Sequence, residues 1–271
     1  MRKRISIPGI VSAVILAAVA IAMIVGSFVT GAATKQSIMD ALLTPGSSGH
    51  LLGTDALGRD IGLLAIAGAM SAVLGPVAIA LGSMVLGIAF GGMAGYFGHG
   101  VDGFIGRIAD LLFSLPVLLI AIVVAGIFDA GYWMTVLLLV VLFSPSDIRI
   151  IRSGVLEQVN LPYVEAAEML SIPHWRILFF HVIPNVWNLI LTNLLLNTSV
   201  ALVTLSSLSY LGVGVRPGSA DWGRQIADGR TIIFDNPAAV LVPSILIVAV
   251  AMSLNLMGDW VSSRNELRGI Q

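Results

Sequence analysis

Six long stretches of this chain are apolar enough to cross a membrane, and they limit the fold more than any other feature of the sequence. Of the 271 residues, 57% are hydrophobic and only 11% are charged, whereas soluble domains carry about 25% charged residues. A transmembrane helix needs about 20 consecutive apolar residues. We therefore expect an all-α, polytopic membrane protein with about six transmembrane helices. The predicted spans are residues 10–29, 63–90, 108–128, 132–151, 186–211 and 238–260.

The first apolar stretch follows a basic N-terminus, so a cleaved signal peptide is the alternative to a first transmembrane helix. The apolar part of a signal peptide has about 7–15 residues, whereas this stretch has 20. We therefore predict an uncleaved helix. It belongs to an N-terminal unit, residues 1–62, that ends in an external segment. Residues 63–271 form a core of five helices.

Basic residues predict the orientation of the chain in the membrane. With the N-terminus inside, nine Arg and Lys residues fall on the inner side and five on the outer side. Because Arg and Lys are enriched in cytoplasmic loops, we predict that both termini are cytoplasmic. This orientation also places residues 160–184, between the fourth and fifth spans, in the cytoplasm. The fourth span is interrupted by a polar segment, and we expect Pro145 to kink or end it.

The sequence contains no recognisable catalytic motif. The only lysines, Lys3 and Lys35, do not lie in a phosphate-binding P-loop. The four histidines are scattered, and there is no cysteine to supply thiolate chemistry or a Cys-based metal site. A net charge of −1 gives no electrostatic basis for binding nucleic acid. We therefore predict a protein that is not an enzyme, with no catalytic residue and no metal site.

Two of the predicted spans carry a patterned face. In the second, Gly87, Gly91 and Gly95 recur every four residues, a spacing that lets two helices pack closely in lipid. In the fifth, polar side chains fall within a narrow arc at 100° per residue. Two interpretations of this arc remain open, namely hydrogen bonding between helices and a translocation pathway lined by neutral polar groups. The candidate pathway residues are Asn185, Asn188, Thr192, Ser199 and Ser206, with a second stripe of Asn193, Asn197 and Thr204 beside them.

Residues 163–170 form a short polar helix in the predicted cytoplasmic segment. It follows Pro162, and Val164, Ala167 and Leu170 lie on one face. A helix this short is marginal alone, so something must bind it. It could lie on the lipid surface, but anionic headgroups would repel Glu165 and Glu168. A docking site for another protein is therefore the favoured interpretation.

The segment EAAEMLSIPHWRILFFHVIPN, which begins at Glu165, resembles the EAA loop of bacterial ABC-importer permeases. Ser171 stands where that family has Gly. The segment LLGTDALGRDI, residues 51–61, is similar to the LGTDxxGRD segment of the second permease subunit of dipeptide, oligopeptide and nickel importers. Residues 208–226 and 255–261 also resemble that family. The chain is thus identified as a member of this permease family.

The resemblance implies a permease subunit that forms half of a translocation pathway in the bacterial cytoplasmic membrane. The implied partners are a homologous second permease, two cytoplasmic ATPases that carry ATP and Mg²⁺, and an extracytoplasmic binding protein; this chain itself would bind no cofactor. In the family the EAA helix sits in a groove on an ATPase. The implied coupling residues are Tyr163, Glu165, Ala166, Ala167, Leu170, Ser171 and Pro184. The external motif is Gly53, Thr54, Asp55, Gly58, Arg59 and Asp60, whose charged members we expect to form structural ion pairs.

A stand-alone channel or secondary transporter is the alternative function. Coupling to an ion gradient would require charged groups in the middle of the membrane. We expect Asp110 and Asp147 to lie near span ends instead, which favours the importer. Dipeptides, oligopeptides, nickel or metallophore complexes, glutathione and haem all suit a pathway lined by neutral polar groups.

Overall fold

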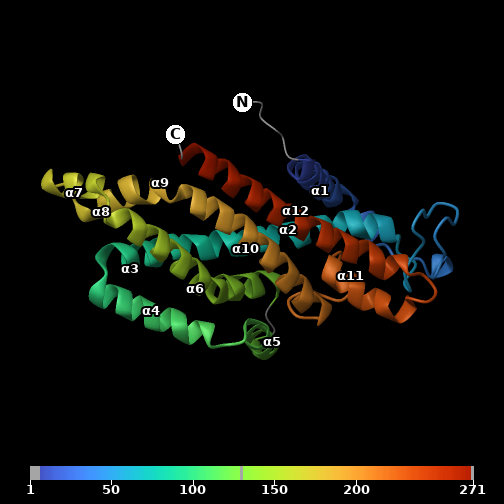
Figure 1. Ribbon diagram of the computed structural model, residues 1–271. Helices are drawn as coiled ribbons and strands as arrows, with labels where there is room; N and C mark the ends of the chain where they lie inside the picture. Colours follow the sequence, from blue (N-terminus) through green and yellow to red (C-terminus); the bar gives the residue numbers. More distant parts are fainter. Residues whose placement is uncertain (1–6, 129–130, 270–271) are drawn as a thin grey trace.

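The computed structural model describes residues 7–128 and 131–269, and this part of the chain is a bundle of helices without a β-strand (Figure 1). Five of its helices are long and apolar enough to cross a membrane, and a bent pair makes a sixth crossing if it forms one span. This confirms the predicted all-α polytopic class. The five are α1 (Ile7–Ala33), α2 (Ile61–Leu86) with its continuation to Phe97, α6 (Tyr132–Val159), α10 (Trp187–Tyr210) and α12 (Ala238–Gly269).

The third predicted span is not one continuous helix. Residues 108–128 begin inside α4 (His99–Phe113) and continue into α5 (Val117–Phe128), and these two helices are bent by 78° relative to each other. The break falls at Ser114–Leu115–Pro116. Proline lacks a backbone N–H and disfavours the helical conformation in the residue before it, so the turn there has a direct cause in the sequence.

The fourth predicted span is longer than expected. We expected Pro145 to kink or end it. Helix α6 does not end there, because it continues from Tyr132 to Val159, past the predicted boundary at residue 151. Pro145 is buried inside the helix. Neighbouring helices can satisfy the backbone groups that a proline frees in a transmembrane helix.

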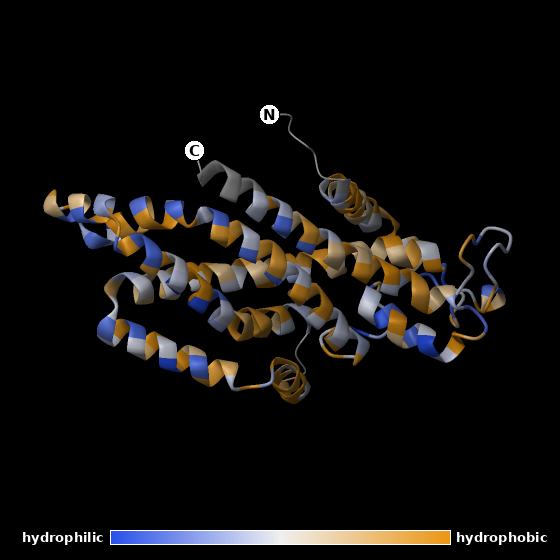
Figure 2. Cartoon of the chain, in the orientation of Figure 1, coloured by the Kyte–Doolittle hydropathy of each residue, from blue (hydrophilic) through white to orange (hydrophobic). Residues whose placement is uncertain are grey.

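Short helices gather at the two ends of the bundle, where hydrophilic residues also concentrate (Figures 1 and 2). One end, here called the α7 end, holds α7 (Pro162–Met169), α8 (His174–Ile177), the π-helical turn η3 (Leu178–Val182) and α9 (Ile183–Asn185). The other, here called the α11 end, holds η1 (Ile38–Asp40), α11 (Trp222–Gly229) and η4 (Arg230–Ile232). The long helices connect these two polar ends.

Helix α2 is central, because it packs against α1 on one side and against α6 and α10 on the other. A π-helical turn, η2 (Gly87–Gly91), joins it to α3 (Gly92–Phe97). The repeated glycines face α6: a Cβ on Gly91 would lie 2.5 Å from the carbonyl oxygen of Ile148, and one on Gly95 would lie 2.8 Å from that of Arg152. The close helix packing predicted from the glycine spacing is therefore present, within this chain.

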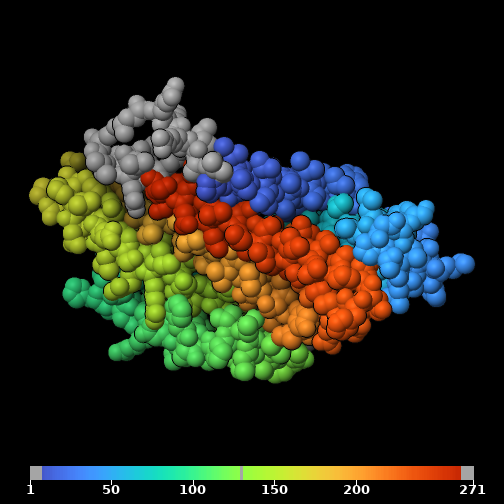
Figure 3. Space-filling model, turned by 45° about the vertical axis from the view of Figure 1, so that its right-hand side comes forward, coloured from blue at the N-terminus to red at the C-terminus, as the bar shows by residue number. Residues whose placement is uncertain are grey.

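On one face of the bundle, α1 and α12 lie side by side next to residues 34–60 (Figure 3).

Two apolar clusters hold α2, α6 and α10 together, one nearer each end of the bundle, and we call them the α7-side cluster and the α11-side cluster. The α7-side cluster includes Met84, Ile151, Val155 and Ile190, together with Val164, Ala167, Ile177 and Leu178 from the short helices. The α11-side cluster includes Ile79, Val136, Leu139, Leu142, Ala201, Leu205 and Leu208.

Candidate functional site

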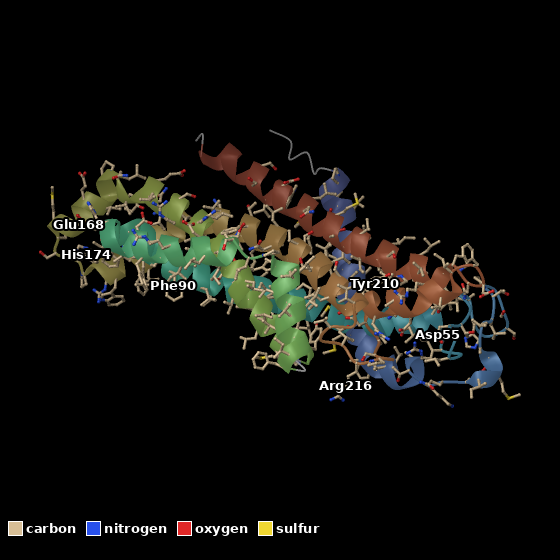
Figure 4. The ribbon with its side chains drawn as sticks, turned by 90° about the horizontal axis from the view of Figure 1, so that it is seen from below. Asp55, Phe90, Glu168, His174, Tyr210 and Arg216 are labelled. Carbon is tan, nitrogen blue, oxygen red and sulfur yellow. The ribbon has the colours of Figure 1, made fainter. Side chains whose placement is uncertain are left out.

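Helix α7 lies at one extremity of the molecule, where Glu168 and His174 are seen far from Asp55 (Figure 4). Pro162 occupies its first turn, where a missing N–H costs nothing, and Glu165 complements the positive end of the helix dipole. The helix is eight residues long. Its ends are set by its own sequence, but its position depends on the elements beneath it.

The buried face of α7 packs on this chain. Val164 and Ala167 are buried in the α7-side cluster against Ile177 and Leu178. Ala167, which the family resemblance implied as a coupling residue, is therefore an internal packing residue in this structure. Tyr163 is half-buried, and its hydroxyl donates to Gln158 Oε1 at 3.1 Å.

The outward face of α7 carries two large apolar side chains. Met169 is 85% exposed and Leu170 is 76% exposed, although we placed Leu170 on the same face as Val164 and Ala167. The helix ends before the last of these residues, so Leu170 turns away from the cluster. Met169 was not among the predicted coupling residues. We call Glu165, Ala166, Met169 and Leu170, which are all exposed, the tip surface.

Ser171 adopts the left-handed conformation that the family's glycine suits, with φ of 55°. Its N–H donates to the Glu168 carbonyl at 2.9 Å, and the Ile172 N–H donates to the Ala167 carbonyl at 3.2 Å. These are the two hydrogen bonds of a Schellman C-cap. The turn is thus kept with serine in place of glycine, at a cost of about 1 kcal/mol. Beyond the turn, Pro184 is exposed in α9.

A side-chain contact ties this loop to the end of the second span. The Tyr96 hydroxyl of α3 donates to Glu168 Oε1 at 3.3 Å and lies 2.9 Å from His174 Nδ1. The rings of Tyr96 and His174 meet edge to face at 5.8 Å. No periodicity in the sequence indicated Tyr96, because its partners are more than 70 residues away. The contact fixes the direction in which α7 leaves the bundle.

Replacing Tyr96 with Phe is expected to loosen α7 without unfolding the bundle. The substitution removes the hydroxyl and keeps the ring, so the loss is that of an exposed hydrogen bond, about 1 kcal/mol. Amide hydrogen exchange of residues 163–169 should accelerate by up to about tenfold. Tyr210→Phe, at the opposite end of the bundle, should leave this exchange unchanged. Equal rates in the two variants would show that Tyr96 does not hold α7.

The external motif builds a closed turn at the α11 end. Asp55 Oδ1 accepts hydrogen bonds from the N–H groups of Leu57 and Arg59, each at 2.9 Å, and Asp55 Oδ2 accepts one from Arg59 Nε at 2.6 Å. Arg59 is 3% exposed, and its guanidinium also donates to the Gly218 carbonyl at 2.9 Å. The turn is therefore fastened to the loop before α11.

The remaining residues of this motif also have structural partners. Asp60 caps α2 by accepting from the Leu63 N–H at 2.8 Å, and it lies 2.6 Å from His50 Nδ1. The Thr54 hydroxyl donates to the Asp40 carbonyl. Gly53 and Gly58 have φ of 74° and 70°, and a Cβ on Gly58 would lie only 1.8 Å from the Ser37 carbonyl oxygen. The motif thus positions the segment between α1 and α2.

The candidate pathway residues on α10 do not share one environment. Asn185 and Asn188 are exposed near the α7 end, and Thr192 and Ser206 are half-buried. Ser199 is buried, and its hydroxyl donates to the Ala251 carbonyl of α12 at 3.1 Å. The exposed stripe on the half of α10 nearer the α11 end is instead formed by Val200, Val203, Thr204 and Ser207, of which the last two are partly exposed.

The second polar stripe of α10 meets a buried acid. The side-chain amides of Asn193 and Asn197 both donate to Asp147 Oδ1. We expected Asp147 near a span end, but it lies in the middle of α6 because that helix continues well beyond Pro145. Asp110, in contrast, is exposed on α4 and pairs with Arg149. The four-residue spacing of Asn193 and Asn197 was the sequence signal for a shared partner.

Another buried acid, Asp221, lies outside the spans. Asp221 caps α11 by accepting from the Arg224 N–H, and Ser71 of α2 donates to its other oxygen at 3.1 Å. Burial raises the pKa of Asp221. Among the described residues, no three His, Asp or Glu side chains gather closely enough to hold a metal ion. The hydrogen bond between Ser71 and Asp221 connects α2 to α11.

Comparisons with known proteins agree on one family. Residues 87–266 match the family model described as binding-protein-dependent transport system inner membrane component. The chain is 32% identical over 213 residues to the glutathione transport system permease protein GsiD of Pectobacterium atrosepticum, which covers 79% of this chain and 71% of that protein. It is 33% identical over 215 residues to the oligopeptide transport system permease protein OppC of Bacillus subtilis, covering 79% of this chain and 70% of the relative.

A further relative supports the same assignment, and a solved structure shares the fold. The chain is 31% identical over 231 residues to the di/tripeptide transport system permease protein DppC of Pseudomonas aeruginosa, covering 83% of this chain and 76% of the relative. Its fold resembles a chain of the MetNI methionine ABC transporter in inward-facing conformations, with a TM-score of 0.52 and 18% identity, over 75% of this chain and 97% of that chain. The chain therefore belongs to the family of inner membrane components of binding-protein-dependent transport systems.

Proposed function

We propose that this chain is the permease subunit of an ATP-driven importer for peptides or related small solutes. Three relatives at about 30% identity are named as permeases for glutathione, di- and tripeptides, and oligopeptides. All of these solutes are short peptides. In this proposal the chain binds no nucleotide and catalyses no reaction, while ATP and Mg²⁺ are bound by partner ATPases.

The observation that carries the coupling proposal is the tip surface. Met169 and Leu170 are exposed on a helix whose other face is anchored in the chain. Exposed apolar side chains on a rigid, protruding element are suited to a pocket in a partner protein. We propose that this partner is a cytoplasmic ATPase and that α7 carries its motion into α6 and α10. A homologous second permease and an extracytoplasmic binding protein complete the assembly.

The decisive experiment is purification of the tagged full-length chain together with co-expressed ATPase candidates, followed by reconstitution in liposomes with a binding protein. The proposal predicts that ATPases co-purify and that import stops without ATP. A stand-alone secondary transporter is the second candidate, and the mid-span carboxyl of Asp147 is the observation that favours it. Import that continues without ATP and follows an ion gradient would establish that second function.

We propose that the translocation pathway follows the exposed stripe of α10. Since the chain contains no cysteine, single cysteines report on solvent directly. In the assembled importer, Val203→Cys should react with a water-soluble thiol reagent at least about tenfold faster than Val14→Cys. Val14 lies on the exposed apolar face of α1, and lipid around such a face excludes these reagents. Ser199→Cys should stay unreactive, since that position is packed on α12. Equal reactivity at positions 203 and 14 would remove this stripe from the pathway.

A further inference from the structure

A fully buried carboxyl group lies where α2, α6 and α10 meet. Asp147 is 0% exposed, and its Oδ1 accepts two hydrogen bonds, from Asn193 Nδ2 and Asn197 Nδ2, at 2.5 Å each. Ser83 of α2 also lies beside this carboxyl. A Cβ on Gly87 would come within 2.5 Å of Asp147 Cβ. The carboxyl is therefore enclosed by three helices, next to the π-helical turn of α2.

Apolar layers separate this carboxyl from both ends of the bundle. Along α6, the α7-side cluster begins one turn after Asp147, and the α11-side cluster ends about one turn before it. The same order holds on α10, where Asn193 and Asn197 lie between Ile190 and Ala201. All members of both layers are buried. Buried apolar side chains therefore lie between Asp147 and each end of the bundle, and Asp147 itself is 0% exposed.

No positive charge faces this carboxyl among the described side chains. Helices α1, α2 and α5 carry no ionisable residue within their described lengths, and α10 carries only Tyr210 at its far end. On α6 itself, Arg149 pairs with Asp110 and Arg152 pairs with Asp102, both on α4. The other described ionisable groups on α6 and on the elements around it are either exposed or bonded elsewhere. Glu157 of α6, His99 and Arg107 of α4 and Asp259 of α12 are exposed. Tyr132 of α6 donates to the Ser71 carbonyl, Tyr96 of α3 bonds Glu168, and His181 of η3 lies 3.2 Å from the Arg176 carbonyl.

We propose that Asp147 is a proton-binding site inside the permease bundle. An ionised carboxylate in a dry site without a countercharge is so unfavourable that the group neutralises instead. The hydrogen bonds fit the neutral acid. Oδ1 accepts from both amides as a carbonyl oxygen would, and Oδ2, which has no hydrogen-bond partner among the described atoms, carries the proton. The Ser83 hydroxyl donates to the Ala80 carbonyl at 3.2 Å, so it supplies no hydrogen bond to an ionised carboxylate.

The bound proton and the closed contact between α6 and α10 stabilise each other. A carboxyl of Asp in water is ionised above about pH 4. Any state in which α6 and α10 separate enough to admit water therefore releases the proton. Protonation in turn favours the packed state, because a ligand shifts a conformational equilibrium toward the state that binds it more tightly. The site thus links proton uptake to the packing of the bundle.

Infrared difference spectroscopy tests this site directly. The full-length chain, with the subunits that accompany it, is placed in lipid nanodiscs at about pH 7.5, where an exposed Asp is ionised. The spectrum of the wild type minus that of Asp147→Asn should contain the carbonyl stretch of a carboxylic acid, which moves to lower frequency in D₂O. Asp55 and Asp221, the other buried acids of the described residues, cancel in this difference. A difference spectrum that contains carboxylate bands and no carboxylic-acid band would overturn the proposal.

Two further measurements complete the test. If the Asp147→Asn variant does not fold, Asn197→Ser removes one donor to Oδ1, and the acid band should remain and move to higher frequency. Asp110→Asn, which changes an exposed carboxyl on α4, should leave the band unaltered. The spectra are also recorded with and without Na⁺. An acid band that disappears when Na⁺ is added would show that the site binds a cation, and this outcome too would overturn the proposal.

Discussion

The variant Met169→Asp is expected to lose at least about thirtyfold of its affinity for the partner ATPase and to support little import. Met169 is the most exposed apolar side chain of α7. Hot-spot side chains near the centre of an interface cost at least about 2 kcal/mol when they are truncated, which corresponds to about thirtyfold in affinity. An aspartate there would also bury a charge without a partner. Co-purification of the ATPase and ATP-dependent uptake measure both effects.

Met39→Asp is the matched control for this variant. Met39 is 96% exposed in η1, at the opposite end of the bundle. The substitution is chemically identical, so it reports any general effect of placing an aspartate on the surface. A basic residue at Ala167 would be a poor test, because Ala167 is buried and the variant would disturb the packing of α7. If Met169→Asp and Met39→Asp bind the ATPase equally well, the tip surface is not the docking site.

The sequence predicted the short helix of the tip but not which of its faces is free. Pro162 and Glu165 mark the beginning of that helix, and these signals are local. The burial of Ala167 depends on Ile177 and Leu178, which come from the next two short elements. The exposure of Leu170 depends on where the helix ends, a boundary that sequence patterns locate only to within a few residues.

The buried acid shows the same limit within the long helices. Apolar runs located the spans, since each run is long enough to cross a membrane by itself. The polar segment around Pro145 predicts a span end there, and therefore a position for Asp147 near that end. Whether a proline ends a helix depends on the groups around it, and here α2 and α10 pack against this part of α6. Only the three-dimensional arrangement therefore shows that Asp147 meets two asparagines.

Replacing Arg59 with Met is expected to lower the free energy needed to open the external turn by about 3–5 kcal/mol. This is the usual cost of removing one partner from a buried ion pair. Methionine has a comparable length but no charge. It would leave Asp55 with an uncompensated charge and the Gly218 carbonyl without its donor. Amide hydrogen exchange of residues 53–60 should accelerate by at least about a hundredfold. Exchange measured by mass spectrometry on the assembled protein resolves this segment.

Arg149→Met provides the control, because Arg149 is 52% exposed and pairs with the exposed Asp110. Surface ion pairs contribute at most about 1 kcal/mol, so exchange in α4 should rise by less than about tenfold. The contrast between the two arginines isolates the effect of burial, since the same side chain is changed in the same way. If Arg59→Met also stays below tenfold, Arg59 does not hold the external turn closed. The large effect is expected because the Asp55 carboxylate stays enclosed after its partner has gone.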